Sequence, residues 1–68
     1  MNRYIIRENI PWEGYIQWTV FAYNEEEAKS FVKLDKAYSG ESLSVHSTRP
    51  AKGRKESGIH KQTSYFTP

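Results

Sequence analysis

Cysteine is absent from this 68-residue chain, which excludes disulfides and thiolate metal sites. Its two histidines are too few for a structural zinc site unless several carboxylates gather around them. No apolar run approaches the ~18 residues of a membrane span, and the N-terminus lacks the apolar segment of a signal peptide. We therefore expect a cytoplasmic protein with no metal, no cofactor and no membrane contact.

Motifs that carry catalytic chemistry are also missing. The chain has no serine hydrolase elbow, no zincin motif and no dinucleotide fingerprint. Gly53 and Gly58 flank a basic stretch, but no Lys-Ser/Thr follows them, which argues against a phosphate-cradling loop. Glutamates 25–27 would point about 100° apart on a helix, so they do not converge on one site. His46 has no obvious carboxylate or nucleophile partner, and we predict that the protein is not an enzyme.

Aromatic residues are plentiful, with five Tyr, three Phe and two Trp, and their burial should supply much of the core. Segment 15–23 alternates with a period of two, which predicts a strand with one wholly apolar face. The core-facing residues would be Ile16, Trp18, Val20 and Ala22. From Asn24 the period changes to about 3.6, and Asn24 with Glu27 forms a capping-box-like pair that predicts a helix start.

The helix is expected over residues 25–37, with a stop at Ser39-Gly40. Its apolar stripe would be Ala28, Phe31, Val32, Leu34 and Tyr38. Asp35 intrudes into that arc, which hints at fraying or bending near the helix end.

Two more strands are expected at residues 3–8 and 41–47, with 9–14 as a hairpin loop. This order predicts an α+β fold of the ββαβ(β) type: a three- to four-stranded sheet with one helix on one face. A right-handed crossover would make the second and third strands parallel. Residues 1–48 would form the compact core.

Residues 49–68 differ in composition from that core. They contain five Lys/Arg and one Glu, for a net charge of +4, whereas residues 1–48 carry five Lys/Arg and seven Asp/Glu, for −2. Residues 49–58 read as a basic loop, and 59–67 as either a short edge strand or a tail that orders on a partner. Such asymmetry suggests an anionic partner, and the alternative is that the basic residues serve only solubility.

The sheet face away from the helix is the more informative surface. It would carry Tyr15, Phe21 and Tyr23, whose rings suit either stacking on bases or anchoring a protein interface. Alternatively, Tyr65 and Phe66 fold back and cover these rings. The predicted partner-binding residues are Tyr15, Phe21, Tyr23, Arg49, Lys52, Arg54, Lys55 and Lys61.

Segments 19–29 and 37–43 resemble the DpnD/PcfM-like domains of mobile elements. They also resemble the small early proteins by which lytic podophages inhibit host RNA polymerase, whose third strand ends near an Arg-Pro like Arg49-Pro50. The Tyr-Ile-Ile-Arg-Glu strand at 4–8 is similar to the first strand of a small type I-F anti-CRISPR inhibitor. The longer basic and aromatic C-terminus departs from the polymerase-inhibitor pattern.

These resemblances imply a phage-type inhibitor that binds and sterically blocks a host nucleic-acid-handling complex, with a CRISPR-Cas effector ahead of RNA polymerase. Its partner would be a host protein or nucleoprotein complex in the host cytoplasm, with DNA or RNA phosphate contact through the basic segment. A directly DNA- or RNA-binding module is the alternative, and the protein would be a monomer or a homodimer.

Overall fold

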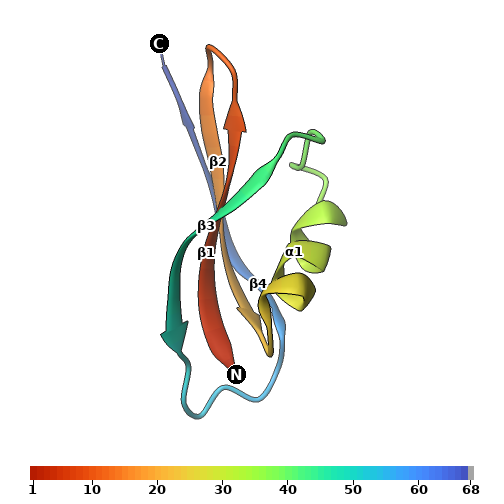
Figure 1. Cartoon of the computed structure of the whole chain (residues 1–68), viewed down its shortest axis with the longest axis vertical. Coiled ribbons are helices and arrows are strands. Elements are labelled where there is room, and N and C mark those ends of the chain that lie inside the picture. Colours follow the sequence, from red (N-terminus) through yellow and green to blue (C-terminus); the bar gives the residue numbers. More distant parts are fainter. Residues whose placement is uncertain (68) are drawn as a thin grey trace.

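One antiparallel sheet of four strands carries a single helix on one face (Figure 1). The computed structural model describes residues 1–67. The elements are β1 (Asn2–Ile10), β2 (Gly14–Ala22), α1 (Glu25–Lys33), β3 (Leu43–Pro50) and β4 (Gly58–Phe66). The strand order is β3-β1-β2-β4, and every neighbouring pair is antiparallel. The α+β class and the order of elements are as predicted. β2 and β3 do run in the same direction, but β1 lies between them.

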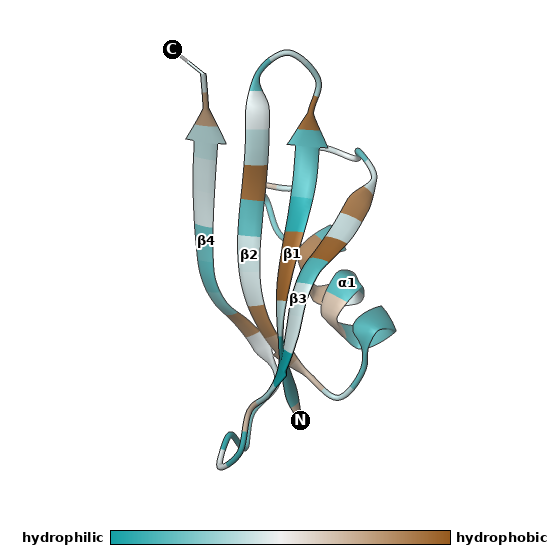
Figure 2. Ribbon diagram, turned by 60° about the vertical axis from the view of Figure 1, so that its left-hand side comes forward, coloured by the Kyte–Doolittle hydropathy of each residue, from teal (hydrophilic) through white to brown (hydrophobic). Residues whose placement is uncertain are grey.

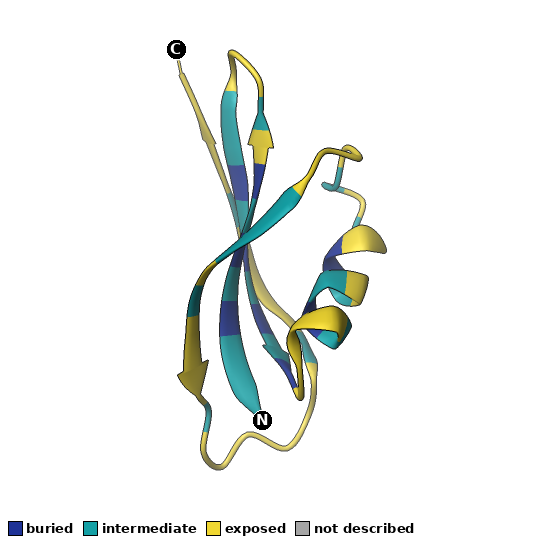
Figure 3. Cartoon of the chain, in the orientation of Figure 1, coloured by how far each residue is buried: buried dark blue, intermediate teal, exposed yellow. Residues whose placement is uncertain are grey.

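The core forms where the central hairpin faces the helix. The predicted face of β2 is buried, and Tyr4 and Ile6 of β1 lie beside it, with Ile6 paired to Trp18. Ala28 and Val32 of α1 complete this core on the helix side. The buried residues sit on β1, β2 and the inner side of α1, while neither edge strand has one (Figure 3). The period-two alternation therefore identified the core face of β2 correctly.

The helix starts as expected but ends earlier. The Asn24 side chain accepts from the Glu27 N–H at 2.8 Å, and a Glu27 carboxylate oxygen accepts from the Tyr23 N–H at 3.1 Å. The prediction of a helix over 25–37 is wrong at its end, because α1 stops at Lys33. Leu34, predicted in the apolar stripe, is 85% exposed.

Asp35 explains this early end. It lies just past α1 and accepts a 2.8 Å hydrogen bond from the indole N–H of Trp18, whose side chain is fully buried. A buried indole N–H without an acceptor would cost free energy, so the bond favours a turn that brings Asp35 to the sheet. The apparent intruder in the helical pattern is a tertiary contact of the core.

Glu8 is a fully buried carboxylate in β1, and it fastens the connection between α1 and β3. Its oxygens accept from the Ser39 N–H at 3.1 Å, the Ser39 hydroxyl at 2.8 Å and the Glu41 N–H at 2.7 Å. Hydrogen bonds to a carboxylate are stronger than neutral ones, which compensates for burying the charge. This cluster sets where β3 begins, since Leu43 pairs with Glu8.

The two edge strands, β3 and β4, differ from the prediction in their bounds. β3 covers Leu43–Pro50 rather than 41–47, so Arg49 and Pro50 belong to the sheet. The C-terminal segment forms β4 on the outer side of β2, which matches the edge-strand alternative. Figure 2 shows β4 as mostly hydrophilic, with hydrophobic residues only near its ends. Each edge strand also has a register shift, which places His46 and His60 in bulges.

No helix among residues 1–67 is long and apolar enough to cross a membrane.

Replacing Glu8 with Gln tests the role of the buried carboxylate. The amide presents an N–H₂ group to donors that need an acceptor, so we expect Glu8→Gln to lower the free energy of unfolding by about 1.5–3 kcal/mol. Urea unfolding measures the loss, and Glu41→Gln, at an exposed position, serves as the matched control. Equal stability of the two variants would show that the cluster around Glu8 is not needed.

Candidate functional site

The sheet face opposite α1, here called the open face, has no helix over it (Figure 1). Residues on it alternate with those of the core face along each strand. Four basic residues occupy open-face positions, and Arg54 joins them from the loop before β4. They are Arg3, Arg7, Arg49 and Lys61. None of the eight Asp and Glu residues takes an open-face position in a strand. The face therefore has one sign of charge.

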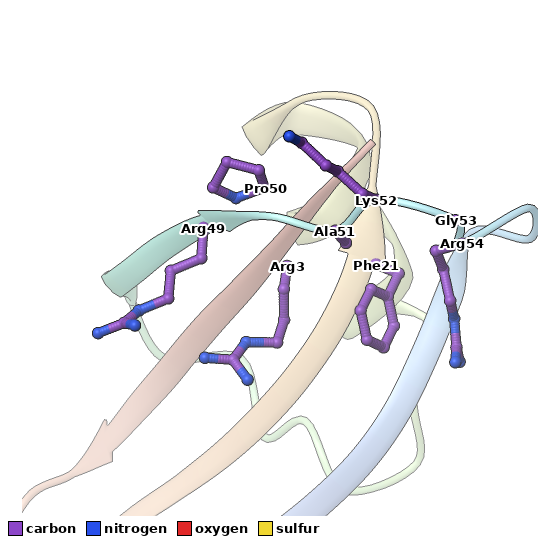
Figure 4. Close-up of a pocket in the computed structure, with 8 residues that line it drawn as sticks. All are labelled: Arg3, Phe21, Arg49, Pro50, Ala51, Lys52, Gly53 and Arg54. Carbon is purple, nitrogen blue, oxygen red and sulfur yellow. The ribbon is translucent and has the colours of Figure 1, made fainter.

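At one end of the open face a row of side chains crosses the sheet. Arg49 pairs with Arg3, and Arg3 pairs with Phe21, so β3, β1 and β2 each contribute one member. Figure 4 shows these side chains and Arg54 on the same side, with Lys52 directed away. Together they border an open pocket of about 600 Å³, here called the arginine pocket. Its lining residues are Arg3, Phe21, Arg49, Pro50, Ala51, Lys52, Gly53 and Arg54.

Phe21 is held inside this pocket by two neighbours. The Arg54 guanidinium lies 4.0 Å from the ring centroid, in cation–π geometry, and the His60 ring meets Phe21 edge-on with 5.5 Å between centroids. The residue opposite Phe21 on β4 is Gly58. No side chain of β4 therefore lies directly opposite Phe21, and Arg54 and His60 are its neighbours instead.

A second group, here called the tyrosine cluster, lies at the other end of the open face. It consists of Arg7, Tyr15 and Tyr65. The two tyrosine rings pack with centroids 4.8 Å apart, and the Arg7 guanidinium lies 4.3 Å from the Tyr15 centroid. The Arg7 Nε–H also donates to Gln17 at 2.8 Å, which fixes the guanidinium over the ring.

The arginines of the open face lack carboxylate partners. Within residues 1–67 the one ion pair joins Lys29 to Glu25 at 3.1 Å, on the helix. The Nε of Arg3 is buried and makes no hydrogen bond inside the described chain. Guanidiniums without carboxylate partners, here beside the half-buried rings of Tyr15 and Phe21, can bind phosphate groups and stack against planar ligands.

The structure brings together only some of the predicted partner-binding residues. Phe21, Arg49, Lys52 and Arg54 all border the arginine pocket. Tyr15 belongs to the tyrosine cluster, and Lys61 stands on the open face opposite Thr19. Two predicted residues lie elsewhere. They are Tyr23, past the end of β2 and 63% exposed, and Lys55, in the loop before β4.

The alternative in which Tyr65 and Phe66 cover the rings of Tyr15, Phe21 and Tyr23 is met only at Tyr15. Tyr65 packs on Tyr15, whereas Phe66, the next residue of β4, lies on the other face of the sheet and is 53% exposed. Arg3 and Arg7 also lie on the open face, although neither was among the predicted partner-binding residues. The sequence could have indicated this, because Arg3 and Arg7 alternate along β1 with Tyr4, Ile6 and Glu8 and so point to the opposite face of the sheet.

No group of three or more His, Asp or Glu side chains within residues 1–67 is placed to hold a metal ion.

Gly14 permits the tyrosine cluster, and its replacement tests this. A Cβ on Gly14 would overlap the carbonyl oxygen of Tyr65, whereas one on Gly58 would meet nothing, although φ is +143° at both. We expect Gly58→Ala to lose about 1–3 kcal/mol from backbone strain, and Gly14→Ala to lose clearly more. Urea unfolding and the NOE between the Tyr15 and Tyr65 rings measure this. Equal losses with an intact NOE would contradict it.

No family model, curated protein or solved structure matches this chain.

Proposed function

We propose that the protein is a non-enzymatic module that binds single-stranded nucleic acid along its open face. The observation that carries the proposal is the mixture of five cations and several rings on a surface without carboxylates. Cations attract the phosphate backbone, and aromatic rings stack on bases of any sequence. Sheets with exposed rings are a recurrent platform for such binding.

Single strands fit this surface better than duplexes. The rings of the tyrosine cluster and Phe21 lie on a sheet face, and only unpaired bases can lay their own faces on such rings. Arg3 and Arg7 are four residues apart in β1, which is about 13 Å along a strand. Cations are thus available at both ends of the face, with Ile5 and Thr19 between them.

Fluorescence anisotropy with labelled single strands and duplexes of the same sequence tests the proposal. We expect the single strand to bind more tightly, with an affinity that falls as salt rises, by a slope of about −0.7 for each phosphate contacted. Tyr15→Ala and Tyr65→Ala should each weaken binding by roughly 1–3 kcal/mol, since each removes a stacking ring.

Tyr65→Phe is the matched control, because it keeps the ring and the Tyr65 hydroxyl makes no hydrogen bond within residues 1–67. Its affinity should stay near that of the parent protein. No binding of either nucleic acid at low salt would refute the proposal, as would alanine variants that bind like Tyr65→Phe.

Inhibition of a host nucleic-acid-handling complex, which the resemblance implies, is the second candidate. It is favoured by Trp12, which is fully exposed in the β1–β2 loop and has a φ of +68°. A bulky residue in this region of backbone conformation is a genuine outlier, and such outliers cluster at functional sites. Trp12 borders a second pocket with Phe66, so the loop offers an apolar anchor of the kind found in protein interfaces.

Binding to a purified type I-F effector complex and to bacterial RNA polymerase tests this candidate. We expect Trp12→Gly to keep the fold, since glycine adopts positive φ without strain, and to weaken capture of the complex at least tenfold. Replacing Lys52, Arg54 and Lys55 together with Ala tests the basic segment in the same assay. Failure of the parent protein to bind either complex would reject the candidate.

A further inference from the structure

The arginine pocket differs from the rest of the open face in its density of charge. Three guanidiniums, those of Arg3, Arg49 and Arg54, border one pocket that no Asp or Glu lines. The remainder of the face carries two cations, Arg7 and Lys61, on different strands. The pocket therefore concentrates more positive charge than any other part of the open face.

Two features of the pocket work against stability unless an anion is bound. Arg3 and Arg49 are directly opposite each other on neighbouring strands, an arrangement in which like charges destabilise the sheet. The Arg3 Nε–H is buried without an acceptor, which costs free energy. One oxyanion bound beside the Arg3 and Arg49 guanidiniums would screen the repulsion, and a shift of the Arg3 side chain toward it would bring the buried Nε–H to an acceptor.

We infer that the arginine pocket binds a terminal phosphate monoester and so anchors one end of the strand on the open face. The inference rests on the proposed function. A monoester carries a charge of about −1.5 to −2 near neutral pH and offers three acceptor oxygens, which suits the forked guanidinium donors that border the pocket. Phe21, held under Arg54, supplies a ring beside the phosphate for the terminal base.

The position of the pocket gives the bound strand a direction. The pocket lies where β3 ends and β4 has yet to begin, so it closes one end of the open face. Tyr15 and Tyr65 lie near the opposite end, since they flank the β1–β2 loop side of the sheet. A strand anchored by its phosphate at the pocket then runs along β2 toward the tyrosine cluster.

End-modified oligonucleotides test the inference. Single strands of one sequence, with an internal fluorophore, carry a 5′-phosphate, a 3′-phosphate or hydroxyls at both ends. We expect one phosphorylated form to bind about tenfold more tightly than the hydroxyl form. No binding of any strand would refute the proposed function, whereas equal binding of all three would refute this inference alone.

Arg3→Gln should abolish the preference for the phosphorylated end. The substitution should not unfold the protein, because the Arg3 Nε has no partner and the like-charge pair with Arg49 disappears. Lys36→Gln, an exposed residue after α1, is the control with the same change in charge, and it should keep the preference. Loss of the preference in Lys36→Gln, or its survival in Arg3→Gln, would overturn the assignment.

Titration of the parent protein with inorganic phosphate and with a nucleoside monophosphate separates a strand end from a free ligand. The Arg3 Nε–H resonance should shift saturably with both, and not with chloride at equal ionic strength. Absence of that shift would overturn the phosphate site. A mononucleotide that binds as tightly as the phosphorylated strand would identify a free-nucleotide site and overturn the strand-end assignment.

Discussion

The carboxylate of Glu8 is the constraint on which the rest of the sheet depends. It is fully buried and takes its hydrogen bonds from the connection between α1 and β3, at Ser39 and Glu41. A buried charge tolerates few alternative arrangements, because each lost donor leaves it uncompensated. Glu8 fixes where β3 begins, and the bulge at His46 then brings Arg49 opposite Arg3. A buried carboxylate on the core side thereby helps to set the positions of two arginines on the open face.

The two layers of the molecule divide the charges between them. Glutamates 25–27 open the helix, where the dipole and the Asn24 cap favour acidic residues. The same residues keep negative charge off the open face, which leaves the arginines there without intramolecular partners. A modest net charge of +2 therefore conceals a strongly polarised molecule. Such polarisation orients an approaching polyanion toward one face.

Local patterns predicted the features that depend on neighbours in the chain. The alternation of β2 and the Asn24 cap were identified correctly, because strand faces and helix starts are set within a few residues. The helix end was missed because it depends on the hydrogen bond between Asp35 and Trp18, seventeen residues away. The placement of the C-terminal segment stayed open for the same reason, since β4 finds its register only on β2. The arginine pocket needed the register of three strands before its members could be grouped.

The arginine pocket is assembled from segments that are far apart in the sequence, and this affects the order in which the molecule folds. The pocket collects Arg3, Phe21, Arg49 and Arg54, so its members are up to about fifty residues apart in the sequence. Contacts between distant segments close large loops and form late, whereas the β1–β2 hairpin is local. During synthesis the hairpin and helix can form first, but β4 cannot pair with β2 until residues 58–66 have been made. The open face is thus complete only once β4 has paired, and a chain cut before Arg54 would lack both β4 and part of the arginine pocket.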